Sequence, residues 1–191
     1  PLKLSISFQG NGMKRRKFLA AGSVWGATSV IAKGAEDSKS KTVVLGSIRD
    51  PMVISTWDFG VRANKKAIEL LNRGGTALDA VQQGVMVVES DPTVTSVGYG
   101  GLPNAAGVVE LDASIMDGSD LECGAVAGLS GFENPISVAR KVMEETPHVL
   151  IVGSGARQFA LSKGFQECDL LTEGSRTAWQ AWRVKQKKKE H

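Results

Sequence analysis

NPISVARKVMEETPHVLIVGSGARQFALSKG (residues 134–164) is the stretch of the chain that says most about its fold. Asn134 followed by Pro135 is typical of a helix start, because asparagine caps free amide groups and proline fits the first helical position. We predict a helix from there to Glu145, because Pro147 prevents its extension. The apolar run HVLIVG then predicts a strand, and a second helix is expected over 154–163. A helix, a strand and a helix in succession indicate a mixed α/β fold.

Two further helices are predicted upstream of this stretch. Residues 61–73 place apolar side chains on one helical face, and Gly74–Gly75 provide a typical helix end. Thr76 is expected to cap a second helix, with Asp79 as the acidic partner three residues later. The buried stripe of that second helix is predicted to consist of Leu78, Val81, Val85 and Val88. We expect the two helices to pack as an antiparallel pair.

Three other segments have the character of strands. The apolar run at 51–56 predicts a strand that leads to the sequence WDFG. From Ser96 the period changes to two, so we predict a hairpin in which residues 96–101 pair with residues 108–117. Residues 123–129 are expected to add a third strand to this hairpin. A final helix is predicted to carry Trp179 and Trp182 on one side.

The charge of the chain is concentrated at its two ends. Residues 1–41 contain eight lysines and arginines against two acids, and residues 183–191 contain five against one. Because the whole chain carries only +3, the body between these ends is acidic. A phosphate-binding face needs cations clustered on the fold itself, so we expect no nucleic-acid partner. A length of 191 residues with 42% hydrophobic side chains suits a single core.

The front of the chain resembles an export signal. Residues 13–32 (MKRRKFLAAGSVWGATSVIA) place four cations before a short run of small apolar residues, as signal peptides do. The string Arg15–Arg16–Lys17–Phe18–Leu19 resembles the twin-arginine signal. The run is too short and too weakly apolar to be a membrane anchor. We therefore expect a periplasmic or secreted bacterial protein, with residues 1–12 upstream of the natural product and residues 33–50 as a lead-in segment. A chance basic segment on a cytoplasmic protein is the alternative.

The familiar cofactor and metal motifs are incomplete. Gly153-Ser154-Gly155 follows an apolar run, yet Gln158 stands at the third glycine position of a dinucleotide fingerprint. The two histidines, His148 and His191, are too few for a histidine-rich metal centre, so we expect no metal and no cofactor. His148 is more typical of a strand edge than of a catalytic triad.

Other candidate groups have simpler interpretations. Asp112 and Asp117 are separated by an odd number of strand residues, which directs them to opposite faces and favours hydrogen-bonding and turn roles over paired catalytic carboxylates. Glycines 98, 100 and 101 lack the lysine of a phosphate loop, so we interpret them as a place where backbones pack closely near a site. Cys123 and Cys168 lack metal-site spacing. They either pair in an oxidising compartment or remain separate buried thiols.

Several stretches of the chain, taken together and in order, are more informative than the single motifs above. The stretches STWDFG, GGTALDAVQQGV, DPTVTSVGYGGLP, LDASIMDG and 134–165, together with the terminal His191, resemble the α-chain of the glycosylasparaginase family. The resemblance covers residues from about 50 to the end. That family belongs to the N-terminal-nucleophile hydrolases of the asparaginase 2 type.

The resemblance implies a fold and a division of the chain. Residues 51–183 would be the α-subunit of the hydrolase domain, which is the α-chain half of a four-layer αββα sandwich. Residues 184–191 would be a lysine-rich linker that ends at the autocleavage region. His191 corresponds to the family's autoprocessing histidine, and an aspartate and a threonine are expected to follow it. The sequence departs from the family pattern in that it stops one residue short of the expected α-chain end.

The resemblance also implies a reaction. No catalytic residue is expected in this chain, because the nucleophile would be the threonine at the start of a β-chain, with its own α-amino group as base. The reaction would cleave the amide between N-acetylglucosamine and asparagine. Trp57 and Phe59 are the expected substrate-binding residues, and a role of Trp57 as a core anchor is the alternative. The implied partners are a β-chain from the same precursor and a glycosylated asparagine substrate, in an (αβ)2 oligomer.

Two alternatives remain open from the sequence. An isoaspartyl peptidase or L-asparaginase of the same superfamily shares the threonine chemistry but takes substrates without a glycan. STWDFG and DPTVTSVGYGG favour glycosylasparaginase. The second alternative is a truncated, non-catalytic half that acts only as a partner chain.

Overall fold

A computed structural model describes residues 50–188 of the chain. The predicted upstream segment 1–12, the predicted signal peptide 13–32, residues 33–49 of the lead-in segment and His191 lie outside the described residues. No helix within residues 50–188 has the length and apolar character needed to cross a lipid bilayer.

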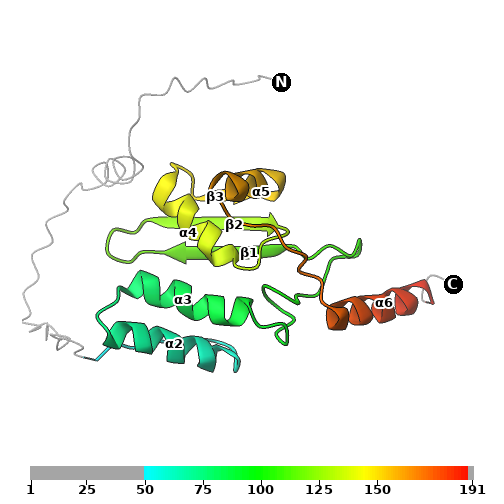
Figure 1. Cartoon of the computed structure of the whole chain (residues 1–191), viewed down its shortest axis with the longest axis horizontal. Coiled ribbons are helices and arrows are strands. Elements are labelled where there is room, and N and C mark those ends of the chain that lie inside the picture. Colours follow the sequence, from blue (N-terminus) through cyan, green and yellow to red (C-terminus); the bar gives the residue numbers. More distant parts are fainter. Residues whose placement is uncertain (1–49, 189–191) are drawn as a thin grey trace, which may run out of the picture. The chain divides into compact units, whose positions relative to one another are not determined.

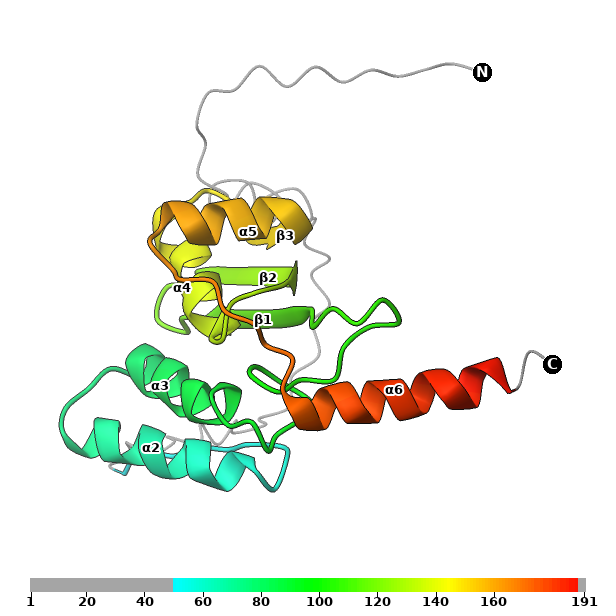
Figure 2. The ribbon, with the colours of Figure 1, turned by 45° about the vertical axis from the view of Figure 1, so that its right-hand side comes forward.

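Two helices form the first part of the described chain. α2 (Gly60–Asn72) and α3 (Ala77–Glu89) lie side by side and antiparallel, as predicted (Figure 2). The predicted cap of α3 is confirmed, since the Thr76 side chain accepts a hydrogen bond from the Asp79 backbone N–H at 3.1 Å. Gly84 allows the close approach of the helices, because a Cβ atom there would lie 2.8 Å from the Ala63 carbonyl oxygen. The helix pair thus follows from its sequence signals, although Val81 of the predicted buried stripe is 46% exposed.

A three-stranded sheet stands beside these helices (Figure 1). β1 (Leu111–Met116) pairs antiparallel with β2 (Cys123–Leu129), which pairs parallel with β3 (Leu150–Val152). α4 (Pro135–Glu145) connects β2 to β3, and α5 (Gly153–Ser162) follows β3. A parallel pair requires such a crossover. The α/β fold, the third strand and all three elements predicted over 134–163 are confirmed.

Two predicted strands are wrong. Residues 51–56 form no strand among the described residues, since no backbone ladder pairs with them, and Met52 and Ile54 remain 71% and 83% exposed. Residues 96–101 are a series of turns instead of a hairpin arm, because Gly98 and Gly100 adopt positive φ values of 58° and 88° that extended strands exclude. The predicted strand at 108–117 is shorter, at 111–116, and pairs with β2 alone.

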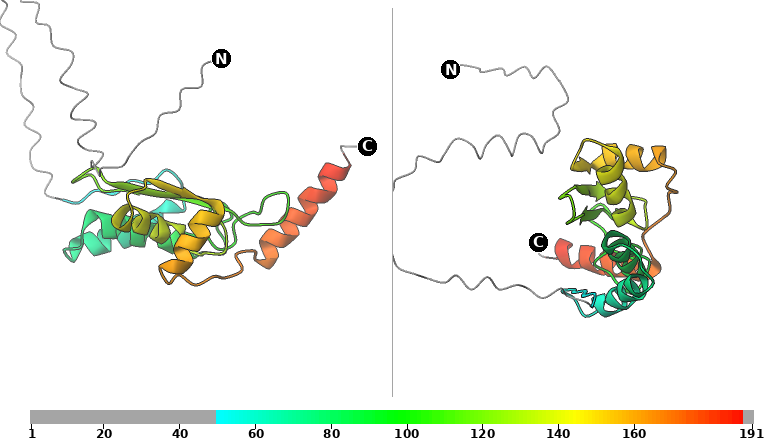
Figure 3. Two further views of the ribbon diagram at one scale, coloured as in Figure 1. Left: turned by 90° about the horizontal axis from the view of Figure 1, so that it is seen from above. Right: turned by 90° about the vertical axis from the view of Figure 1, so that its left-hand side faces the viewer.

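The core lies on one face of the sheet. α4 and α5 cover this face, and Val138, Ala139 and Val142 of α4 are fully buried against it. Gly124 of β2 permits this packing, since a Cβ atom there would lie 2.2 Å from the Ala139 carbonyl oxygen. Figure 3 (left) shows the helices gathered on that side of the strands. This arrangement gives one helix layer and one sheet layer.

The opposite face of the sheet is open in the described chain. Met116 of β1 is 57% exposed, and Leu150 and Val152 of β3 are 52% and 55% exposed. These side chains alternate with buried ones along their strands, such as Ile115 at 4% exposure. A face that carries such apolar side chains is more typical of a packed surface than of a solvent-exposed one.

The last helix, α6 (Glu173–Lys187), is capped by Thr172, whose side chain accepts a hydrogen bond from the Ser175 backbone N–H. Its first turn is anchored where the Ser175 hydroxyl donates to the Gly100 carbonyl. Trp179 packs against Gly107, and Arg183 lies over the Trp179 ring. Residues 184–187 are helical, which differs from the predicted linker that begins at 184. Polar and charged side chains such as those at 185–187 can be solvated in a helix as well as in an extended linker, so the helix continues through them.

The two cysteines are free thiols in the structure. Cys123 is partly buried and Cys168 is exposed, so the prediction of buried thiols is wrong for Cys168.

Candidate functional site

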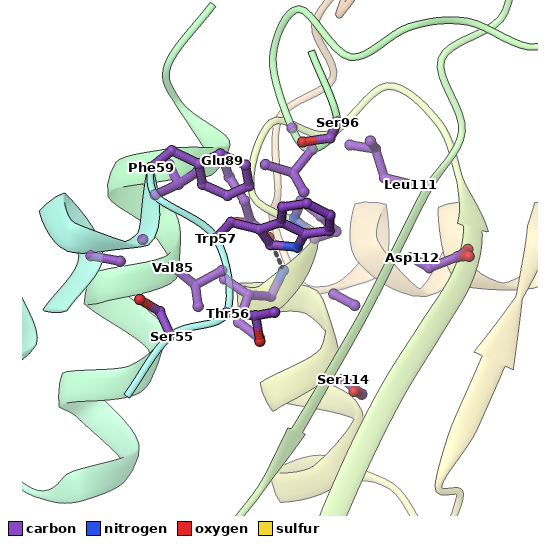
Figure 4. Close-up of a pocket in the computed structure, with 18 of the residues that line it drawn as sticks. Ser55, Thr56, Trp57, Phe59, Val85, Glu89, Ser96, Leu111, Asp112 and Ser114 are labelled. Carbon is purple, nitrogen blue, oxygen red and sulfur yellow. Dashed lines mark hydrogen bonds between the residues drawn. The ribbon is translucent and has the colours of Figure 1, made fainter. Parts of the chain in front are cut away.

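A cavity of about 490 Å³ opens between the helix pair α2 and α3, the start of α4 and the sheet strand β1 (Figure 4). Its walls come from the segment before α2, the end of α3, the turns at 96–98, β1 and the first turn of α4. Three of the described residues that line it are acids, Glu89, Glu110 and Asp112, and none of them is basic. The cavity therefore has an aromatic and apolar wall, with Glu110 and Asp112 on the β1 side and Glu89 at the end of α3.

The two predicted substrate-binding residues meet in this cavity. The rings of Trp57 and Phe59 stack with centroids 6.2 Å apart and planes inclined by 13°. Trp57 is 67% exposed, so its ring is available to a ligand, and it does not serve as the core anchor that was the alternative. Figure 4 shows both rings above the space that β1 borders. Their role in binding substrate stays a prediction.

The local backbone explains how these rings are presented. A tight turn forms before α2, in which the Gly60 N–H donates to the Trp57 carbonyl at 2.9 Å. Asp58 accepts a hydrogen bond from the Phe59 N–H at 2.8 Å. Gly60 is required because a Cβ atom there would lie 2.3 Å from the Ser55 hydroxyl oxygen. The sequence STWDFG thus encodes a turn that holds two aromatic rings at the cavity edge.

The floor of the cavity is a glycine-rich turn. Gly98 lies so close to α3 that a Cβ atom there would overlap the Glu89 carbonyl oxygen, at 1.9 Å. The Tyr99 N–H donates to the same carbonyl at 2.6 Å. The interpretation of these glycines as a point of close backbone packing near a site is confirmed.

Glu89 is a cavity residue that the sequence analysis missed. It is 3% exposed; its Oε1 accepts from the Ile136 N–H at 3.2 Å, and its Oε2 has no partner. Burial raises the pKa of this carboxyl to about 8, and the nearby negative charge of Glu133 acts in the same direction. A signal was present in the sequence, because an acid in the last turn of an apolar helix opposes the helix dipole.

The remaining candidates have structural roles. Asp112 accepts a hydrogen bond from the Gly128 N–H at 2.7 Å, beside an irregularity in the β1–β2 register. Asp117 holds a turn by accepting from the Ser119 N–H and hydroxyl at 2.8 and 2.7 Å. The hydrogen-bonding and turn roles predicted for these two acids are confirmed. His148 lies after α4 and outside the cavity, where its N–H donates to the Thr146 hydroxyl.

No group of three or more histidine, cysteine or acidic side chains within residues 50–188 is arranged to hold a metal ion. His191, the predicted autoprocessing residue, lies outside the described residues. The structure therefore brings Trp57 and Phe59 together at one cavity, and leaves the geometry at His191 undescribed.

Several curated proteins are similar in sequence to this chain. The N(4)-(beta-N-acetylglucosaminyl)-L-asparaginase of Elizabethkingia miricola is 50% identical over 158 residues, which cover 82% of this chain and 46% of that protein. The protein of the same name from Rattus norvegicus is 45% identical over 140 residues, 73% of this chain and 40% of the relative. A plant-type L-asparaginase of Pyrococcus abyssi is 52% identical over 111 residues, 58% of this chain and 36% of the relative.

This chain spans about half the length of the curated relatives it matches. The profile of the family described as Asparaginase matches residues 47–191, which include every helix and strand described above. The chain therefore belongs to this asparaginase family of N-terminal-nucleophile hydrolases.

Proposed function

We propose that this chain forms part of an amidohydrolase that cleaves the bond between N-acetylglucosamine and the side-chain amide of asparagine. The observation that carries the proposal is the exposed Trp57–Phe59 stack at a cavity of about 490 Å³, in a chain of the asparaginase family. A cavity of this size and shape suits a small ligand. The 50% identity to a protein named N(4)-(beta-N-acetylglucosaminyl)-L-asparaginase supports the choice of this amide bond.

The proposed nucleophile is a threonine at the start of a β-chain, outside this sequence. A terminal amine has a pKa near neutrality and lies beside its own hydroxyl, so one residue supplies both the attacking group and the base. The threonine oxygen would attack the amide carbon, the glycosylamine would leave with a proton, and water would then cleave the threonine ester. The described residues would contribute the wall against which the substrate lies, through the faces of Trp57 and Phe59.

The open face of the sheet supports a second layer from the same precursor. Met116, Leu150 and Val152 stand exposed on it, although each is apolar. In the proposed assembly the β-chain covers this face and completes a four-layer αββα sandwich, and two αβ units associate. A β-sheet face of this kind is stable when another layer buries it.

The proposal is tested in the full-length protein, by which we mean the precursor that contains both this chain and the proposed β-chain. Three substrates are compared: N-acetylglucosaminyl-asparagine, L-asparagine and a β-aspartyl dipeptide. We expect the glycosylated substrate to give the highest kcat/KM. Trp57→Ala should raise KM for it about tenfold or more, because a ligand loses an aromatic wall, and Trp57→Phe should recover most of the loss. Trp182→Ala is the matched control, since Trp182 is an exposed tryptophan on α6, outside the cavity. Equal losses in both alanine variants would refute the pocket role.

A second candidate is an L-asparaginase or isoaspartyl peptidase. The 52% identity to a plant-type L-asparaginase favours it, although that similarity covers less of this chain. Preference for L-asparagine or the β-aspartyl dipeptide in the same assay would establish it. Absence of turnover on all three substrates would favour a non-catalytic partner chain.

We also propose export by the twin-arginine route to the periplasm or beyond. The basis is the Arg15–Arg16 pair ahead of a short apolar run. Since that route carries folded proteins, self-cleavage would precede export. Replacing both arginines by lysine should retain the protein in the cytoplasm in cut form, as fractionation and immunoblotting would detect. Only uncut precursor in the cytoplasm would contradict the order of events.

A further inference from the structure

The junction between the end of α3 and the start of α4 contains two buried acceptors without donors. They are Oε2 of Glu89 and Oδ1 of Asn134. The other polar atom of each of these two side chains is hydrogen-bonded across the same junction. Glu89 Oε1 accepts from the Ile136 N–H at 3.2 Å, and Asn134 Nδ2 donates to the Ser90 hydroxyl at 3.3 Å. Figure 4 shows Glu89 reaching from α3 into the region behind Trp57, with its bond to the first turn of α4 drawn as a dashed line.

Two lone acceptors in one place are costly. A buried polar atom without a partner has given up its hydrogen bonds to water and has gained none in return. Asn134 could cap α4 but does not, because its side chain makes no bond to the helix N-terminus. Glu89 performs this task instead, through the Ile136 N–H. The junction therefore uses a side chain from one helix to cap another, and it leaves one oxygen on each side without a donor.

Burial and the negative charge of Glu133 oppose the ionisation of Glu89. Glu133 lies just before α4, and Glu110 and Asp112 line the same cavity from the β1 side. The first turn of α4 carries no acid, and its contribution is the single backbone N–H of Ile136. A buried carboxylate without a cation is unfavourable, and a proton removes that charge. It also converts Oε2 from an acceptor into a donor.

We infer that Glu89 is a positioning residue that enters the cavity wall as a neutral acid, with its Oε2 hydroxyl donating to Oδ1 of Asn134. One proton then satisfies both lone acceptors. The bond would fasten the end of α3 to the start of α4 at the place where the Glu89 backbone also carries the Gly98–Tyr99 turn. Its consequence for substrate rests on the proposed function: loss of the proton should loosen the floor beneath the Trp57–Phe59 wall and weaken binding.

The pH dependence follows from the raised pKa of Glu89, which is about 8 against an ordinary 4.5. Between these values the unfolded chain ionises at Glu89 while the folded chain keeps its proton. The folded state therefore binds more protons, and its stability falls as pH rises from about 4.5 to 8. A glutamine at this position has a similar shape, donates from its amide and does not titrate, so it should remove this dependence.

The direct test is a carbon-13 NMR titration of the side-chain carboxyls in the full-length protein, with the Glu89 signal assigned by its absence in Glu89→Gln. We expect its midpoint to lie above neutrality and Asn134→Ala to lower it, because the neutral acid loses its acceptor. A midpoint near 4.5 would overturn the inference. So would an increase of the midpoint in Asn134→Ala, because Asn134 would then be the donor to a carboxylate.

Two further measurements separate this role from general packing. Glu89→Gln should melt at a higher temperature than the wild type at pH 9 and at the same temperature at pH 4. In the substrate assay, the wild type should show a rise in KM above pH 8 that Glu89→Gln lacks. Parallel KM profiles would refute the positioning role. The NMR titration needs no activity, so an inactive protein with a high Glu89 midpoint would contradict the proposed function and leave this inference intact.

Discussion

The two faces of the sheet differ in how far their side chains are exposed to solvent. The face beneath α4 and α5 is sealed: Val126 and Leu129 of β2 are 1% and 0% exposed, and the helix side chains opposite them are equally buried. The other face exposes Met116, Leu150 and Val152, and the cavity with the Trp57–Phe59 stack lies along β1 at the edge of the sheet. The covered face therefore carries most of the buried core, and the proposed binding wall of Trp57 and Phe59 lies outside that core.

The difference separates the part of the chain that carries the buried core from the face that the proposed second layer would cover. The continuous apolar core lies on the covered side, where Gly124 allows α4 to pack closely on β2. The open side combines exposed apolar strand residues with a segment at 51–56 that, among the described residues, pairs with no strand. A surface of this kind is expected where another polypeptide layer packs.

The largest expected effect concerns residues 42–191 produced alone. We expect them to aggregate or to fold poorly, because the open face and the edges of β1 and β3 have no cover. Analytical ultracentrifugation and thermal melting would measure this. Leu150→Lys combined with Val152→Lys should reduce the aggregation, since both side chains lie on the open face. A monomer that melts cooperatively without these changes would break the comparison between the faces.

Next in size is a core truncation on the covered side. Phe132 is 2% exposed within the main core, so Phe132→Ala should lower the free energy of unfolding of the full-length protein by about 3–5 kcal/mol. Urea denaturation gives this value. Leu121→Ala is the control, because Leu121 is 70% exposed in a turn, and it should change stability by about 0.5 kcal/mol or less. Similar losses in the two variants would contradict the assignment of stability to the covered face.

A substitution of Gly98 tests the packing of the cavity floor, and substitutions of Gly164 and Gly118 serve as comparisons outside the cavity. Gly98→Ala should cost about 2–5 kcal/mol, because it combines a positive φ of 58° with a backbone contact of 1.9 Å. Gly164→Ala should cost about 1–2 kcal/mol, since Gly164 has a positive φ and nothing within 4 Å. Gly118→Ala should be nearly neutral, because neither constraint applies there. The order of the three losses in urea denaturation is the prediction, and equal losses would rule out a tightly packed floor.

The smallest expected effect concerns the turn beside α2. The Thr93 hydroxyl, the Thr93 N–H and Arg62 hold the pKa of Asp91 at about 2. Because this pKa is depressed, the stabilisation is present above pH 4 and is lost as pH falls through about 2. Asp91→Asn should therefore lower the melting temperature slightly at pH 6 and leave it unchanged at pH 2. A deficit that persists at pH 2 would show that the effect is not electrostatic.

Much of the covered face was predictable from the sequence. Thr76, Pro135, Pro147 and the glycine pair 74–75 are local signals, and the helices begin and end near them. The strands at 111–116, 123–129 and 150–152 also follow from apolar runs. Local signals suffice here because a helix or a packed strand depends mainly on its own pattern and caps.

The open face and the site were less predictable. Residues 51–56 look like a strand, yet a strand needs a partner, and none of the described residues provides one. The turn at 96–101 depends on positive φ values that spacing alone does not reveal. Glu89 was missed because its burial arises from α4, which lies 46 residues further along the chain. Trp57 and Phe59 were found through the family resemblance, because exposed aromatic residues carry no periodic signal.

The central claim is that this chain supplies a binding wall while the reacting threonine comes from a separate β-chain. The most direct measurement is hydrolysis of N-acetylglucosaminyl-asparagine by the full-length protein and by any soluble fraction of residues 42–191, side by side. The account predicts release of aspartate by the full-length protein and none by the shorter one. Release of aspartate by residues 42–191 alone would contradict it.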